Sequence, residues 1–157
     1  MGSIRKGGVA AALVAGTLAL TGCITPESSI PSKTNDARKA VGLGPLSTDP
    51  PGGADIYNRA RMWAAKMCQD RVVSHSALSA YYQPAGNWRA LGENVGRVGW
   101  NQNDTNSQDA STNSLWSTFM NSPSHRTNIL GNWTHQVVAQ WPCQDGRLYV
   151  THVFLRY

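Results

Sequence analysis

Three residues carry side chains that could do chemistry together, namely His75, Glu93 and His125. Each lies at the expected end of a helix or strand, where functional sites are commonly built. Two imidazoles and one carboxylate form an incomplete zinc-type ligand shell with an open position. A divalent metal such as zinc is therefore the one cofactor indicated, with His75 and His125 as its first candidate ligands. The spacings match no short metal motif, so the sequence leaves open whether these side chains meet.

The clearest local signal is the helix that would carry His125. Ser122 is a good N-cap, Pro123 suits the first helical position, and Gly131 follows as a stop residue. His125 then lies in the first turn, where the helix dipole favours the neutral imidazole that binds metals or accepts protons. The alternative is that His125 only ties loops together through hydrogen bonds.

The N-terminus reads as a lipoprotein leader over residues 1–22. A positive start is followed by an apolar run too short to span a bilayer. Leu20-Thr21-Gly22-Cys23 resembles the bacterial lipobox, which implies export, cleavage before Cys23, and a diacylglyceryl anchor on its sulfur. The alternative is an ordinary signal peptide before a chance cysteine. Residues 23–33, rich in Pro and Ser, are interpreted as the lipidated cysteine and a tether.

After the leader and the tether, the length and composition of the chain indicate one domain over residues 34–157. The whole chain of 157 residues has a net charge of +5, and removal of Arg5 and Lys6 with the leader leaves +3. The basic residues are scattered, so no nucleic-acid partner is expected. We expect a monomer whose partners are the membrane, through Cys23, and a small ligand.

Two further cysteines, Cys68 and Cys143, remain if Cys23 carries lipid. An oxidising compartment favours one disulfide between them, and two free buried thiols are the alternative.

Apolar periodicity and turn residues predict several helices and loops before a C-terminal hairpin. Helices are expected over about 35–42, 55–73 and 111–120, with irregular structure over 48–53, 78–89 and 101–114.

The hairpin has strands over 137–141 and 148–155, joined at Asp145-Gly146. Apolar residues at both parities of the second strand predict cover on both faces. Pro142 predicts an edge strand or a bulge. Helices before a sheet, with a further strand after Gly92, predict an α+β layered domain.

Four segments occur in a characteristic order: Asn35-Asp36-Ala37-Arg38 with Gly42-Leu43-Gly44-Pro45-Leu46, then His75-Ser76, then Gly92-Glu93-Asn94-Val95, and then Phe119-Met120-Asn121-Ser122-Pro123-Ser124-His125-Arg126-Thr127-Asn128-Ile129-Leu130. Together they resemble the bacterial form of the CAP superfamily (cysteine-rich secretory, antigen 5 and pathogenesis-related proteins). The resemblance implies a three-layer α–β–α sandwich.

The resemblance also implies a cleft lined by two His and two Glu. By position, His75, Glu93 and His125 match three of the four. The second Glu normally comes from the preceding helix, where this chain has Trp116-Ser117-Thr118-Phe119-Met120-Asn121-Ser122 and no carboxylate. One carboxylate instead of two argues against a paired general acid and base and weakens metal affinity.

Three functions are consistent with this reading. The first is a binding module at the cell envelope for a small hydrophobic, lipid or wall-derived ligand, since relatives bind sterols or lipids. The second is a metal-assisted, protease-like hydrolase using His75, Glu93 and His125. The third is a structural envelope protein without an active cleft. We expect binding, not catalysis. His135 and His152 are not expected to be ligands.

Overall fold

The computed structural model describes residues 25–85 and 87–157. The elements, in chain order, are α1 (Pro26–Ala40), α2 (Gly53–Asp70), α3 (Ser79–Tyr82), η1 (Gln83–Ala85), β1 (Ala90–Gly99), α4 (Thr105–Asn121), α5 (Pro123–Ile129), β2 (His135–Cys143) and β3 (Arg147–Arg156). The predicted leader and the lipidation site at Cys23 lie outside the described residues. Within those residues, every helix is too short or too polar to cross a membrane.

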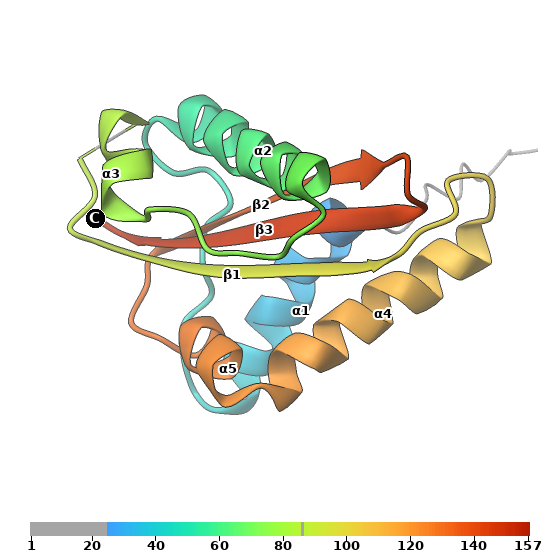
Figure 1. The fold of residues 1–157 in the computed structure, drawn as a ribbon. Coiled ribbons are helices and arrows are strands. Elements are labelled where there is room, and N and C mark those ends of the chain that lie inside the picture. Colours follow the sequence, from blue (N-terminus) through green and yellow to red (C-terminus); the bar gives the residue numbers. More distant parts are fainter. Residues whose placement is uncertain (1–24, 86) are drawn as a thin grey trace, which may run out of the picture.

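The fold is a three-layer α–β–α sandwich, as the sequence predicts. The three strands are antiparallel in the order β1-β3-β2, with α2 and α3 on one face and α1, α4 and α5 on the other (Figure 1). One core lies between the sheet and α1, α4 and α5, with Ile30, Phe119 and Phe154 at its centre. Two smaller clusters lie under α2 and α3.

The central strand β3 is buried along its length. Its residues from Leu148 to Leu155 are all buried, and alternate side chains enter the two cores because successive residues of a strand face opposite sides. This explains why apolar residues occur at both parities. Pro142 lies in the edge strand β2, opposite Leu148, where a missing N–H can face away from the ladder.

The predicted tether over residues 23–33 is wrong from Pro26 onward. Helix α1 begins there and runs through the predicted domain boundary at residue 34. Thr25 and Ser28 form a capping box, Pro26 occupies the first turn, and Ile30 is fully buried. The Pro and Ser residues that suggested a linker therefore start a helix here. The folded domain includes the whole of α1, from Pro26 onward.

The predicted loop over 101–114 is wrong from Thr105 onward. The side chain of Asp104 accepts hydrogen bonds from the backbone N–H groups of Asn106 and Ser107, and it starts α4. Gln108 and Thr112 face the core, so the buried stripe is polar at this end and gives no apolar period. The irregular stretch 78–89 also contains the short helix α3 and the 3-10 turn η1.

The predicted disulfide between Cys68 and Cys143 is present. The bond joins the last turn of α2 to the end of β2, with 5.7 Å between the two Cα atoms. It closes a loop of 75 residues that contains the candidate site.

Candidate functional site

The candidate site is built around the exposed edge of the sheet. Strand β1 is an edge strand, and its neighbouring residues Glu93 and Asn94 face opposite layers. Glu93 contacts residues from the loop after α2 and from α3, whereas Asn94 contacts α5. Side chains from both helical layers therefore meet around this edge.

Glu93 is the fixed centre of the site. Its side chain is fully buried, and its carboxylate accepts three hydrogen bonds. The donors are the backbone N–H of Ser76 at 3.0 Å, Nδ1 of His75 at 3.1 Å and the Tyr82 hydroxyl at 3.4 Å. Burial, reinforced by the negative Glu93, raises the pKa of Tyr82, which keeps its hydroxyl protonated and able to donate. A buried carboxylate with these partners serves as an anchor for its neighbours.

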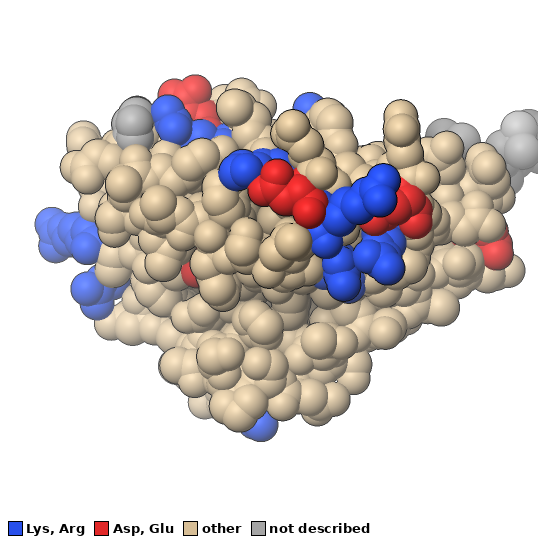
Figure 2. Space-filling model, viewed as in Figure 1, with Lys and Arg blue, Asp and Glu red and all other residues tan. Residues whose placement is uncertain are grey.

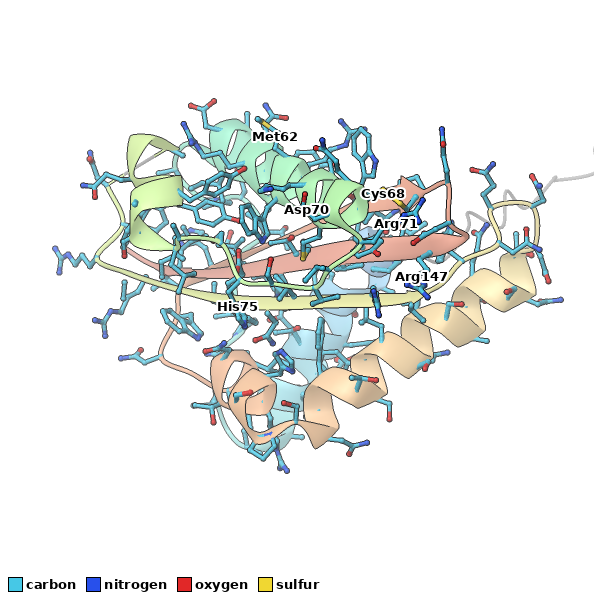
Figure 3. The ribbon with its side chains drawn as sticks, viewed as in Figure 1. Met62, Cys68, Asp70, Arg71, His75 and Arg147 are labelled. Atoms are coloured by element: carbon cyan, nitrogen blue, oxygen red, sulfur yellow. A yellow bond between two sulfur atoms is a disulfide. The ribbon has the colours of Figure 1, made fainter. Side chains whose placement is uncertain are left out.

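His75 is the exposed member of the site. Its side chain is 54% exposed and lies at the β1 edge, between the loop after α2 and helix α5 (Figure 3). Because the ionised Glu93 carboxylate can only accept, Nδ1 of His75 carries the proton in their 3.1 Å contact. In the neutral imidazole, Nε2 is then the acceptor. The ring is held through Nδ1 by the buried carboxylate, and Nε2 is free to contact a ligand.

His125 lies in the first turn of α5, as predicted. Burial lowers its pKa, and the nearby positive charge of protonated His75 lowers it further. The neutral imidazole expected from the helix dipole thus has burial as its main cause. The ring packs on Phe119 with 5.1 Å between ring centroids, and its buried Nδ1 has no hydrogen-bond partner among the described residues. The side chain of Ser122 contacts the Ser124 hydroxyl and makes no capping bond.

Two asparagines brace the site. Asn128 donates to the backbone oxygen of Glu93 at 3.1 Å and to Oδ1 of Asn94 at 2.8 Å. Asn94 in turn donates to the backbone oxygen of His125. Trp133 donates to the backbone oxygen of Asn128 and packs against Gly92, where an added Cβ would lie 2.9 Å from its ring. These bonds lock α5, and therefore His125, onto β1.

The site offers a divalent metal two imidazoles and no carboxylate, because Glu93 is held by its three donors. Over residues 25–85 and 87–157, no three His, Cys, Asp or Glu side chains are grouped so that they could hold an ion. The Glu93 carboxylate is already taken up by three donors, and α4 supplies no second carboxylate. His75 and Glu93 are joined by a hydrogen bond, whereas His125 is near enough to His75 to feel its charge and has no partner for its Nδ1 among the described residues.

The remaining polar candidates have other roles. Ser76 accepts a hydrogen bond from the backbone N–H of Leu78 and so belongs to a turn. His152 is fully buried in β3 and bonds Oε1 of Gln136 through Nε2 at 3.0 Å, and burial lowers its pKa to about 3. His135 begins β2 and bonds the Thr134 hydroxyl. The part played by Tyr82 was not predicted, because no short pattern in the sequence links it to Glu93.

Solved structures resemble this fold at low sequence identity. An outer surface protein of Borrelia burgdorferi has a TM-score of 0.63 and 16% identity, covering 81% of this chain and 89% of that one. An extracellular SCP-domain protein of Bacillus anthracis has a TM-score of 0.63 and 20% identity, covering 84% of this chain and 40% of that one. A cysteine-rich secretory protein of Staphylococcus aureus has a TM-score of 0.61 and 21% identity, covering 84% and 38%.

This chain therefore spans about two fifths of the Bacillus and Staphylococcus proteins. No curated protein matches it. A model of the cysteine-rich secretory protein family, CAP, matches residues 32–154, which is most of the chain. This match, together with the sandwich fold, shows that the chain belongs to the CAP family.

Proposed function

We propose that this chain is a lipid-anchored protein of the bacterial cell envelope that binds a small envelope-derived ligand at His75 and His125. The observation that carries the proposal is the held imidazole of His75. Its Nδ1 is fixed on the buried Glu93, and its half-exposed ring faces outward beside a neutral His125. Such fixed polar groups recognise the polar part of a ligand without reorganising.

A groove of mixed polar and apolar lining lies between the end of α4 and α5. The groove has a volume of about 530 Å³ and is lined by the end of α4 and by α5, including Met120, Pro123 and Leu130. Pro123 and Arg126 also flank His125 in the sequence, so groove and imidazole belong to one short helix. The groove lining does not include His75, Glu93 or His125, so the groove is a separate surface that could take the apolar part of a ligand.

A hydrolase is the second candidate, and one observation favours it. A histidine oriented through Nδ1 by a buried carboxylate is the arrangement of a general base. Against it stand the missing second carboxylate and the Ser76 hydroxyl, which accepts a backbone N–H. Binding is therefore the function proposed.

Mass spectrometry of the native protein tests the proposal. The chain is purified from its own host under non-denaturing conditions, and bound small molecules are identified. We expect a co-purifying ligand that is retained by His135→Ala, because His135 lies at the start of β2 outside the site. The amount of bound ligand should fall by up to about tenfold in His75→Ala and in His125→Ala, because each change removes one hydrogen bond from a neutral imidazole. A ligand held equally by all three variants, or no ligand, would contradict binding at this site. Turnover of the released molecule by the wild type, lost in His75→Ala, would favour the hydrolase.

A further inference from the structure

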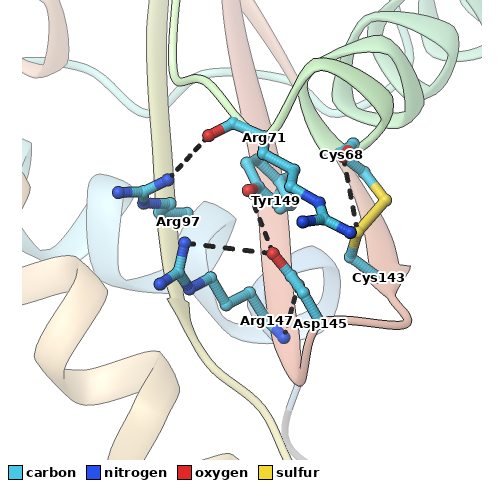
Figure 4. The surroundings of a disulfide bond; sticks show 7 residues. All are labelled: Cys68, Arg71, Arg97, Cys143, Asp145, Arg147 and Tyr149. Carbon is cyan, nitrogen blue, oxygen red and sulfur yellow. Dashed lines mark hydrogen bonds and ion pairs between the residues drawn. A yellow bond between two sulfur atoms is a disulfide. The ribbon is translucent and has the colours of Figure 1, made fainter.

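The end of the sandwich that carries the disulfide also carries a group of arginines. Arg71 is the C-cap of α2, Arg97 lies on β1, and Arg147 begins β3. Figure 2 shows basic side chains, with acidic ones between them, over the end of α2 and the adjoining half of β1, and Figure 3 places Arg71 and Arg147 there. Nη1 of Arg97 donates to the backbone oxygen of Arg71 at 3.0 Å, which brings α2 and β1 together (Figure 4).

The acidic residues of this end are already paired. Asp70 forms an ion pair with Lys66 at 2.7 Å. Asp145 lies 3.9 Å from Nη1 of Arg147 and accepts a hydrogen bond from Tyr149. In the described part of the chain, no carboxylate is ion-paired with Arg71 or Arg97, so this end presents two uncompensated positive charges. Val72, next to Arg71, is 54% exposed and adds an apolar contact.

The start of α1 lies at the same end of the sheet. Its first turn is held on β2, because Oε1 of Glu27 accepts the backbone N–H of Gln140 at 2.8 Å. Gln140 precedes Cys143 by three residues, roughly 10 Å along a strand, and Cys143 pairs with Arg147. The helix start therefore lies toward the same end of the sheet as the arginines, at least roughly 10 Å from them and on the other face (Figure 1).

The link from a lipid on Cys23 to this helix is very short. Thr25 is the N-cap of α1 and is fixed by its capping box. Two residues of chain span at most about 7 Å. This link keeps the domain against the membrane. Because charges act on a membrane surface only within about 8 Å at physiological salt, the arginines reach the headgroups when the domain turns this end toward the surface.

We propose that Arg71, Val72, Arg97 and Arg147, here named the arginine face, bind the anionic headgroups of the membrane that anchors the chain. The face then fixes the orientation of the domain and keeps the His75 and His125 edge at a constant height. This inference rests on the proposed anchoring at Cys23, which would place the arginine face at the membrane. The complementary charge and the exposed valine favour a lipid surface as its occupant.

Vesicle co-sedimentation of the unlipidated mature chain tests the proposal. The protein is the chain from residue 23 with Cys23→Ser, which keeps every described contact. We expect it to bind vesicles that contain phosphatidylglycerol and not vesicles of phosphatidylcholine alone, with binding lost at high salt. Arg71→Gln should weaken binding about fivefold and Arg71→Gln/Arg97→Gln about 25-fold, at the strength usual for an arginine near an anionic surface.

The matched control is Arg89→Gln/Arg156→Gln. It removes the same charge, but at the opposite end of the sheet, where Ala90 pairs with Arg156. This control should bind like the unchanged chain. Equal loss in both double variants, binding to neutral vesicles, or equally strong displacement by soluble inorganic polyphosphate would overturn the assignment to the membrane. The assay needs no lipid on Cys23, so a native protein found without an acyl chain would refute the anchoring and leave the vesicle result intact. Arg71→Gln alone keeps the bond from Arg97 to the residue 71 carbonyl and guards against a folding artefact.

Discussion

At the scale of single residues, Glu93 determines whether the site can exist. Its carboxylate satisfies the backbone N–H of Ser76, the imidazole of His75 and the hydroxyl of Tyr82. We predict that Glu93→Gln lowers the free energy of unfolding by about 1–3 kcal/mol, because its amide NH₂ group would face donors inside a buried position. Urea unfolding measures the effect. Tyr82→Phe is the milder companion, since it removes only the 3.4 Å bond. A change below about 0.5 kcal/mol for Glu93→Gln would contradict the role of an anchor.

The pKa of His125 should also depend on whether His75 is present. Burial and the charge of His75 both lower the pKa of His125. We predict that His75→Gln raises the pKa of His125, since one of the two causes disappears, while His135→Gln leaves it unchanged. NMR titration of the imidazole protons measures both. An unchanged value in His75→Gln would mean that the two rings do not share one site.

The buried His152 predicts how stability changes with pH. Its pKa in the folded state is about 3, below the usual 6.5, so the unfolded chain binds the extra proton first. The contribution of His152 is complete above about pH 6.5 and is lost as the pH falls toward 3, by up to about 1.4 kcal/mol per pH unit. His125 acts in the same direction. Unfolding curves between pH 7 and 5 should show a smaller slope for His152→Gln than for the wild type. Equal slopes would be evidence that His152 is accessible to water.

At the scale of elements, the contact between β1 and α5 depends on a glycine. An added Cβ at Gly92 would lie 2.9 Å from the Trp133 ring and 3.4 Å from Oδ1 of Asn128. We predict that Gly92→Ala costs about 1–3 kcal/mol, the usual cost of overpacking. It should also weaken ligand binding, because α5 carries His125. Gly99→Ala on the same strand is the matched control, since nothing lies within 4 Å of its added Cβ. Equal melting temperatures for the two variants would contradict this packing argument.

The disulfide is the covalent link between α2 and β2. It closes a loop of 75 residues, and loop-closure entropy predicts a loss of roughly 4–5 kcal/mol when it is removed. We predict that reduction, or Cys68→Ser/Cys143→Ser, markedly lowers the melting temperature seen in calorimetry, while Cys23→Ser in the same chain does not. An unchanged melting temperature after reduction would show that the hairpin and α2 hold together without the bond.

The same elements show what could be predicted from the sequence. The hairpin and α5 were predicted correctly because their signals are local, namely Asp145-Gly146 in one and Ser122-Pro123 in the other. The starts of α1 and α4 were missed because a Pro- and Ser-rich stretch, or an Asn-rich one, is helical here only through caps and tertiary cover. Ile30, for example, is buried only against elements distant in the chain. Local propensity could not reveal that cover.

The candidate site likewise has a part that could be predicted from the sequence and a part that could not. His75, Glu93 and His125 were found through a resemblance that preserves their order, and the structure brings them together around one strand edge. The hydrogen bond from Tyr82, which completes the three donors around the Glu93 carboxylate, depends on the relative placement of α3 and β1. That placement has no counterpart in spacing along the chain.

At the scale of the whole molecule, the proposed lipid on Cys23 would determine where the protein is found. We predict that Cys23→Ser moves the protein from the membrane fraction of its host to the soluble fraction, as measured by fractionation and immunoblotting. The membrane-bound wild type should carry a diacylglyceryl mass at Cys23. The two acyl chains give firm binding, whereas the few charges of the arginine face supply only a weak, salt-sensitive attraction. Cys68→Ser/Cys143→Ser is the control that should stay in the membrane fraction, because it changes the same residue type and leaves the anchor. If the Cys23→Ser protein stayed with the membrane at high salt, the anchor would have to lie elsewhere, and the orientation inferred from the start of α1 would lose its basis.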